Sequence, residues 1–352
     1  MLKNRAFRTD YATALAQAYG AGFRQHPSLR HLSTSFAIDS DKAGGDVRKH
    51  IARTLSQARV HAHRDVIRDL AQGLLEPALQ ARSVDLLREF AIPYTLQVVC
   101  KLLGVPSQLA ESIPSVSAGL LTALDCARLS AAELEDLDTR TQAIAEQFVR
   151  FLGSPQARES ECIAGLLDIA HEHTLPLESV FSDLLFLLLA GFETTSSSVA
   201  QIGWFLARYP DVAEDLRSGA ADTAVIVEEF ARMFPPVHIV TRRPGVDVEL
   251  AGATVRSTQT VAVLIAAANR DPSAFADPGA FMQGRARSSV LTFSAGWHHC
   301  LGAMLARQEI GIALEVMLEH PQLRRASVAT WRKLGVFRSL QALSLVDPHH
   351  HH

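Results

Sequence analysis

One long apolar segment limits the folds open to this chain of 352 residues. Residues 178–208 keep apolar side chains at helical spacing, and the pattern stops at Tyr209-Pro210, because a proline disfavours helix in the residue before it. A helix this long and this apolar at its start is expected to cross the protein interior. Its most hydrophobic run, 184–192, is too short to span a bilayer, so we expect no membrane span.

Most other segments also have the pattern of amphipathic helices, and strand signals are few. Residues 84–106 have helical spacing and end in Gly104 and Pro106, and a last helix is predicted over about 301–319. Residues 246–255 predict a hairpin around Ala251-Gly252, with a further strand over 260–268. The predicted fold class is therefore mainly α with small β-sheets.

Composition narrows the function. The chain is 48% hydrophobic and 20% charged, and its net charge of −3 gives no global field that favours nucleic acid or an acidic membrane. The four cysteines, Cys100, Cys126, Cys162 and Cys300, are too widely spaced for a disulfide framework or a zinc ribbon. Without the apolar core of a signal peptide at its start, the chain is expected in the cytoplasm. Residues 349–352 have the form of a purification tag.

Cys300 lies at a position that favours a reactive or metal-binding thiolate. Cys300 lies where a loop punctuated by Gly296 becomes a helix, and the N–H groups and partial positive charge of a helix start stabilise a thiolate. Gly296 and Gly302 allow something large and flat to approach the backbone, and Phe293 can shield the sulfur from water. A single thiolate suits the axial ligand of a haem iron, whereas a buried structural cysteine is the competing interpretation.

Two further motifs gain meaning only beside Cys300. The first motif is 190–198, "AGFETTSSS". Gly191 allows close approach of a ligand, and Glu193 with Thr194 forms an acid and hydroxyl pair that can pass protons. A polar patch between two core segments explains the same motif equally well. Glu229 and Arg232, spaced i and i+3, can form an ion pair that is uninformative by itself.

Taken together, these motifs resemble those of the cytochromes P-450, the haem-thiolate monooxygenases. Residues 293–302 are similar to the haem-binding loop of that family, 190–195 to its oxygen-activating helix motif, 229–232 to its E-x-x-R pair and 268–281 to the segment between the pair and the loop. The motifs occur in the family's order, and the chain from about 84 to Val346 resembles a bacterial soluble member throughout.

The resemblance implies a P-450 fold in which the long central helix passes over haem b, within one haem-thiolate domain over 1–348. Cys300 would be the thiolate ligand of the iron and would favour O–O cleavage, with protons delivered by Glu193 and Thr194. The residues that would bind the cofactor are Arg48, Ala190, Gly191, Arg242, Phe293, Ser294, Gly296, His298, Leu301, Gly302 and Ala306. Arg285 matches an arginine that joins Glu229 and Arg232 in a structural trio.

The carboxylate arms of the haem would be bound by Arg48, Arg242 and His298, with Arg243 as the alternative to Arg242 in a shifted register. The family usually has a histidine four residues before the arginine at position 48. Here that position is Gly44, and His50 fits only in another register, so one contact has no assigned residue.

Implied partners are a ferredoxin or flavodoxin on the proximal face, near His299, Arg307 and the basic residues of 48–64, and a lipophilic or carrier-bound substrate. The N-terminal β region of the family is missing or reduced, so we expect a more open distal pocket. Its lining is expected to include Phe192, Leu189, the residues 237–240 and Phe337. No nucleic acid partner is expected, and the protein is expected to be a monomer.

The predicted reaction is hydroxylation or epoxidation of a lipophilic natural-product intermediate. One alternative is a family member diverted to oxidative coupling, desaturation or peroxide-driven chemistry. Intact Glu193 and Thr194 favour oxygen activation, since peroxide-driven members often alter that pair. A haem-binding protein without catalysis is the remaining alternative.

Overall fold

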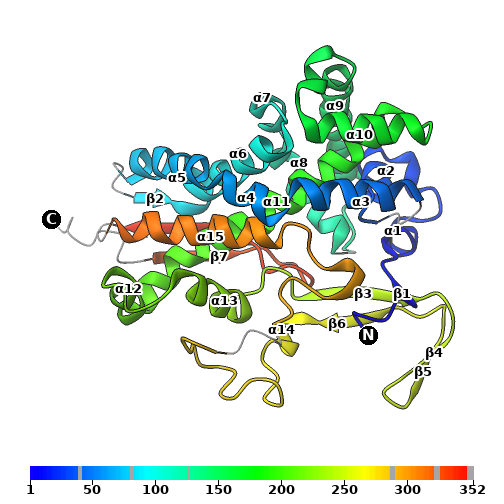
Figure 1. Cartoon of the computed structure of the whole chain (residues 1–352). Helices are drawn as coiled ribbons and strands as arrows, with labels where there is room; N and C mark the ends of the chain where they lie inside the picture. The colour runs from blue at the N-terminus through cyan, green and yellow to red at the C-terminus, as the bar shows by residue number, and fades with distance from the viewer. Residues whose placement is uncertain (39–41, 80–82, 126, 286–289, 321–325, 347–352) are drawn as a thin grey trace.

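The computed structural model describes residues 1–38, 42–79, 83–125, 127–285, 290–320 and 326–346. The tag residues 349–352 and Cys126 lie outside this part of the chain. At the centre of the fold is α11 (Leu177–Arg208), one continuous helix (Figure 1) that confirms the predicted crossing of the interior. It ends at Tyr209, directly before Pro210.

The middle of α11 carries hydroxyl side chains that bond back to its own carbonyls. The Thr194 Oγ1 hydroxyl donates to the Ala190 carbonyl at 2.9 Å, and the Ser198 Oγ hydroxyl donates to the Thr194 carbonyl at 3.1 Å. These bonds satisfy polar groups inside an apolar core, which is how a run such as 194–198 is tolerated in a buried helix.

The predicted helix over 84–106 is divided into three elements. A strand β2 (Ser83–Asp85) is followed by a π-helical turn (Leu86–Ala91) and by α6 (Ile92–Leu103). Pro93 has no N–H and fits only the first turn of a helix, so the regular helix starts there rather than at residue 84. Gly104 then ends α6 in a left-handed conformation, as its position after the last apolar residue predicts.

The remaining helices surround this centre. In chain order they are α1 (Tyr11–Tyr19), α2 (Pro27–Thr34), α3 (Lys42–Thr54), α4 (Gln57–Ala62), α5 (Arg64–Leu79), α7 (Ser107–Ala110), α8 (Ile113–Leu124), α9 (Ala131–Leu152), α10 (Glu161–Glu172), α12 (Pro210–Arg217), α13 (Thr223–Met233), α14 (Ile265–Ala268) and α15 (Ala303–Leu318), with 3-10 turns at Phe23–Gln25, Pro155–Glu159 and Gly296–His298. Helices α9 and α10 stand at the top of Figure 1, and α12 and α13 lie below α15.

Three small sheets complete the fold. The first has the order β1 (Phe7–Arg8), β3 (Ile239–Pro244), β6 (Val261–Leu264), and the second has the order β2, β8 (Leu340–Val346), β7 (Ala326–Trp331). The third is the hairpin of β4 (Val248–Leu250) and β5 (Ala253–Val255), which projects at the lower right of Figure 1. Its turn is at Ala251-Gly252, as predicted, and both residues have positive φ.

One strand expectation needs correction. The strand predicted over 260–268 ends at Leu264, because the chain turns into α14 there. The last helix predicted over about 301–319 is observed as α15, whose apolar side chains are mostly buried, although Met304 is exposed. No helix among the described residues is long and apolar enough to cross a membrane. The mainly α fold with small sheets is confirmed.

Candidate functional site

A single cavity of about 360 Å³ lies between α11 and the loop that carries Cys300. Apart from Gly296, every residue singled out by the sequence as catalytic, cofactor-binding or metal-binding lines it. They are Arg48, Ala190, Gly191, Glu193, Thr194, Arg242, Phe293, Ser294, His298, Cys300, Leu301, Gly302 and Ala306. Residues that are far apart in the sequence therefore meet at one site.

Gly296 has a different neighbour. It has φ of +72°, and a Cβ at this position would lie 2.4 Å from the carbonyl oxygen of Leu2. Within the described residues it does not line the cavity. The glycine thus permits close approach of the N-terminal backbone, where the sequence alone suggested close approach of a flat ligand.

Cys300 lines the cavity, and its side chain is exposed to that space. Its N–H donates to the Phe293 carbonyl at 2.9 Å, which fixes the loop, and α15 begins three residues later. Burial raises the pKa of the Cys300 thiol, and the Gly302 N–H, Arg307 and Arg48 lower it less. Burial therefore opposes the stabilisation of a thiolate by the helix start, and a bound metal ion would favour loss of the thiol proton.

Three cationic or potentially cationic side chains converge on the same cavity. Arg242 is buried, donates to its neighbour's carbonyl at Thr241 at 2.8 Å, and reaches Ser294 Oγ at 3.5 Å. Arg48 donates to the His299 carbonyl at 2.8 Å. Burial, followed by the charges of Arg242 and Arg48, lowers the pKa of His298 to about 4.

No carboxylate pairs with Arg48 or Arg242 anywhere in the described part of the chain. A buried guanidinium group without an anion, such as that of Arg242, is costly, so the cavity favours an anionic ligand. An iron protoporphyrin, with a metal for Cys300 and two carboxylate arms for the cations, fits this donor set.

The shifted register with Arg243 in place of Arg242 is excluded by the sheet. Arg243 points away from the cavity, where it forms an ion pair with Asp10 at 2.7 Å and donates to the Ser257 carbonyl. His50 is also occupied elsewhere, because its Nε2 lies 2.8 Å from the Cys162 carbonyl on α10.

Sequence reasoning missed Thr9. In the antiparallel pair of β1 and β3, Arg8 lies opposite Arg243, so the next residue, Thr9, comes beside Arg242. Thr9 lines the cavity, and its buried Oγ1 has no hydrogen-bond partner among the described residues. Its only sequence signal was its position after a two-residue strand, which gives no warning of a ligand contact.

Helix α11 covers the other side of the cavity. Ala190 is exposed to it although Leu189 beside it is buried, and Gly191 packs so closely on α6 that a Cβ would lie 2.9 Å from Val99 Cγ2. The small residues therefore bring the helix near to both the ligand space and α6. Next to them lies the Thr194 hydroxyl, whose donated bond goes to the Ala190 carbonyl.

Glu193 is buried, with 5% of its surface exposed, and lines the same cavity. Its two carboxylate oxygens lie 3.4 and 3.5 Å from Nη1 of Arg332, a residue that directly follows β7. The sequence gave no indication of this ion pair, because its partners are 139 positions apart.

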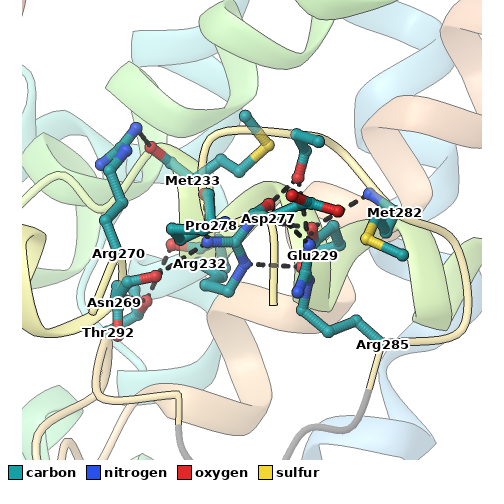
Figure 2. A network of polar contacts seen from close by, with 12 residues as sticks. Glu229, Arg232, Met233, Asn269, Arg270, Asp277, Pro278, Met282, Arg285 and Thr292 are labelled. Carbon is teal, nitrogen blue, oxygen red and sulfur yellow. Dashed lines mark hydrogen bonds and ion pairs between the residues drawn. The ribbon is translucent and has the colours of Figure 1, made fainter. Parts of the chain in front are cut away.

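The pair of Glu229 and Arg232 is confirmed as the centre of a network of polar contacts (Figure 2). Two nitrogens of Arg232 bind the two oxygens of Glu229 at 2.7 and 2.8 Å, and Arg285 binds Glu229 at 3.0 Å, as the trio predicts. Arg232 also donates to the carbonyls of Asn269 and Pro278, and the Asn269 side chain receives the Leu291 N–H. The network thus fixes the irregular segment around Leu291 that leads into the Cys300 loop.

The rest of the cavity is lined mainly by apolar side chains, with Thr195, Thr292, His299 and Glu309 among the polar exceptions. Its lining includes Phe36, Leu121, Leu124, Phe186, Leu189, Val237, Val240 and Phe337. Phe192, His238 and Ile239, which the sequence suggested as lining residues, are not among those the cavity touches; Phe192 is fully buried in the core instead.

Four of the lysine and arginine residues expected on the proximal face are already paired with acids. Lys49 pairs with Asp46, Arg59 with Glu161, Arg64 with Glu315 and Arg307 with Glu228. Trp297, within the Cys300 loop, is 54% exposed. The face therefore offers less unpaired positive charge than the sequence suggested, together with one large exposed aromatic side chain.

Comparisons with known proteins agree on one family. The profile described as "Cytochrome P450" matches residues 223–330. "Cytochrome P450 BJ-3" of Bradyrhizobium diazoefficiens is 30% identical over 365 residues, covering 96% of this chain and 83% of the relative. "Putative cytochrome P450 133B2" of Xylella fastidiosa is 28% identical and covers 99% of this chain and 88% of the relative.

Two further similarities bear on the fold and on the range of family chemistry. The "6-deoxyerythronolide B hydroxylase" of Saccharopolyspora erythraea is 28% identical over 323 residues, covering 89% of this chain and 78% of the relative. The solved structure of the myxobacterial cytochrome P450 CYP267B1 in complex with myristic acid superposes with a TM-score of 0.85 at 26% identity, covering 100% of this chain and 87% of that one.

Proposed function

This chain belongs to the cytochrome P450 family of haem-dependent monooxygenases, and from this premise we propose that its cavity binds haem b, with Cys300 as the residue that would supply a thiolate to the iron. One observation carries the assignment: Cys300 opens into a cavity where Arg48, Arg242 and His298 converge without a carboxylate partner among the described residues. Bound haem activates O2, so that one oxygen atom enters the substrate and the other leaves as water after uptake of two electrons and two protons.

Arg242, Arg48 and His298 hold the two carboxylate arms. We add Thr9, because its buried hydroxyl has no partner in the described chain and stands beside Arg242. Thr9 would make the contact to a haem carboxylate that a histidine makes in other family members, where this chain has Gly44. The remaining contacts to the ring come from Ala190, Gly191, Phe293, Ser294, Leu301, Gly302 and Ala306, all of which line the cavity. Residues 1–348 then act as one haem-thiolate domain.

Glu193 and Thr194 deliver the protons. Both line the cavity on α11, and the Thr194 hydroxyl lies at the surface of the helix that faces the ligand space. A carboxylate can exchange protons with water, and a neighbouring hydroxyl can pass them on, so the two groups move protons from solvent to the reacting oxygen.

The substrate is lipophilic, because the part of the cavity away from Cys300 is lined by aliphatic and aromatic side chains. A fatty acid occupies the similar myxobacterial structure, and the hydroxylase relative carries the name of a natural-product enzyme. We therefore propose hydroxylation or epoxidation of an intermediate of secondary metabolism, either free or bound to a carrier.

The electrons come from a ferredoxin or flavodoxin that docks beside Cys300. Exposed Trp297 supplies an apolar contact for the donor protein. Arg59, Arg64 and Arg307 are already paired with acids, so the association rate should depend less on salt concentration than it would for a face of unpaired basic residues. The protein works as a cytoplasmic monomer.

The test is the absorption spectrum of the reduced protein with carbon monoxide. A Soret band at the thiolate-type position supports Cys300 as the ligand, and Cys300→Ser must lose it. Cys162→Ser is the matched control, since Cys162 is buried outside the cavity and should keep the band. An imidazole-type band in the unmodified protein rejects the proposal.

A further inference from the structure

The ion pair of Glu193 and Arg332 joins the cavity to the outside of the protein. Glu193 lines the cavity, whereas Arg332 does not touch it within the described chain and has 24% of its side chain exposed. The carboxylate therefore lies between the ligand space and a cation that solvent reaches. The Arg332 side is the solvent side of this acid.

The pair is also loose. One guanidinium nitrogen, Nη1, faces both carboxylate oxygens at 3.4 and 3.5 Å, which is beyond the range of strong hydrogen bonds. Among the residues that the structure describes, the Arg332 side chain forms no other hydrogen bond, so its orientation depends on Glu193 and on its own backbone. A contact of this kind orients a carboxylate and still lets it turn away.

Arg332 belongs to a segment that contacts the substrate side of the cavity. The Gly335 N–H donates to the Asp125 carboxylate at the end of α8 at 2.9 Å, and the Arg338 N–H donates to the Pro236 carbonyl at 2.8 Å. The His238 N–H donates to the Val336 carbonyl at 2.8 Å, and Phe337 lines the cavity. A ligand that presses on Phe337 or on the end of α8 therefore acts on the segment that carries Arg332.

We propose that Arg332 is a positioning residue for proton delivery: it orients the Glu193 carboxylate in the resting enzyme and, through residues 332–340, links that orientation to the contents of the substrate pocket. The inference rests on the proposed role of Glu193. In each transfer the Glu193 carboxylate takes up one proton from solvent water on the Arg332 side and passes one proton toward the cavity, so the carboxylate is restored for the next transfer.

The first experiment tests the contact itself and requires no catalysis. Arg332→Glu places a second carboxylate beside Glu193, so it should raise the unfolding equilibrium constant of the haem protein about tenfold more in the unmodified chain than in the Glu193→Gln background. Equal effects in both backgrounds would show that the two side chains do not interact and would overturn the proposal.

The second experiment tests the function. The probe is myristic acid, with NADPH, a plant-type ferredoxin and its reductase, and the readouts are the fraction of consumed O2 released as hydrogen peroxide and the solvent deuterium effect on O2 consumption. We expect Arg332→Gln to slow productive O2 consumption about tenfold and enlarge the deuterium effect, with Arg332→Lys restoring most of the rate. In the Glu193→Gln background, Arg332→Gln should add nothing.

The matched control is Arg338→Gln. Arg338 lies in the same segment, but its guanidinium stacks on Trp331 at 4.3 Å and has no bond to Glu193. It should leave the peroxide fraction and the deuterium effect unchanged. Additive losses from Arg332→Gln and Glu193→Gln, or an equal loss in Arg338→Gln, would reduce Arg332 to a structural role. Loss of the thiolate-type carbon monoxide band would instead count against the proposed function.

Discussion

Two buried glutamates of this protein each pair with an arginine, and the two pairs are built differently. Glu229 and Arg232 are 4% and 0% exposed and meet through two bonds of 2.7 and 2.8 Å. Glu193 and Arg332 are 5% and 24% exposed and meet through one nitrogen at 3.4 and 3.5 Å. The acids are equally buried, so the difference lies in what surrounds each arginine.

Arg232 is saturated by its surroundings. Besides Glu229, it donates to the carbonyls of Asn269, Pro278 and Ala280, so every direction of its guanidinium is used (Figure 2). Such a group can hardly move, because each displacement would leave a buried polar atom unsatisfied. Arg332, by contrast, bonds through Nη1 alone among the described residues, and 24% of its side chain is exposed. The comparison indicates that the first pair fixes a loop and that the second is able to open.

The strongest way to break the fixed pair is Arg232→Met. The change removes three carbonyl bonds and leaves Glu229 with Arg285 as its remaining cation, so we expect a loss of about 3–5 kcal/mol of unfolding free energy and failure to retain haem. Chemical denaturation and the carbon monoxide band measure both effects. The control is Arg217→Met, which breaks the exposed pair with Glu214 at the same i, i+3 spacing and should cost less than about 0.5 kcal/mol.

The opposite pattern is expected for Glu193→Gln. Arg332 stays solvated when its partner is neutralised, so the unfolding free energy should change by less than about 1 kcal/mol. Productive O2 consumption should fall about 100-fold, because the acid that exchanges protons is lost. If stability fell as far as in Arg232→Met, Glu193 would be a structural residue and the contrast between the two pairs would disappear.

Patterns within short stretches of sequence predicted the fixed pair and the central helix. Glu229 and Arg232 are neighbours on one helix face, and α11 is marked by its apolar spacing and by Pro210, so both follow from positions near in sequence. The resemblance to a family then brought Cys300, Arg242 and His298 to one cavity, which spacing alone cannot do. Each of these predictions rests on residue types that must stand at a definite distance from one another.

The features missed by the sequence depend on distant backbone. Arg332 meets Glu193 only because the β7–β8 sheet packs beside α11, and Thr9 comes beside Arg242 only through the register of β1 and β3. The charge of the proximal face was also overestimated, since the acids that pair with Arg64 and Arg307 lie on α15 and α13. No periodicity of a single segment carries such information.

A smaller change sharpens the contrast on the side of the fixed pair. Arg285→Gln keeps Glu229 bound to Arg232 and removes the 3.0 Å bond from the second arginine, together with the bonds to the carbonyls of Asp277 and Ala280. We expect a loss of about 1–2 kcal/mol with haem retained, as judged by denaturation and by the carbon monoxide band. A loss equal to that of Arg232→Met would mean that the trio acts as one unit rather than as a core pair with a support.

The smallest effect is expected for Ser197, which contacts the segment that carries Arg332. The Ser197 hydroxyl accepts the Leu340 N–H at 3.2 Å and donates to the Arg338 carbonyl at 3.4 Å, so it ties the Arg332 segment to α11. Ser197→Ala should lower the unfolding free energy by about 1 kcal/mol and raise the peroxide fraction slightly, because the segment then holds Glu193 less well. Ser198→Ala, which removes only a bond within α11, should leave the peroxide fraction unchanged. Equal peroxide release in both variants would show that the bonds of Ser197 to this segment do not affect the orientation of Glu193. Arg332 would then orient Glu193 without help from the rest of the segment.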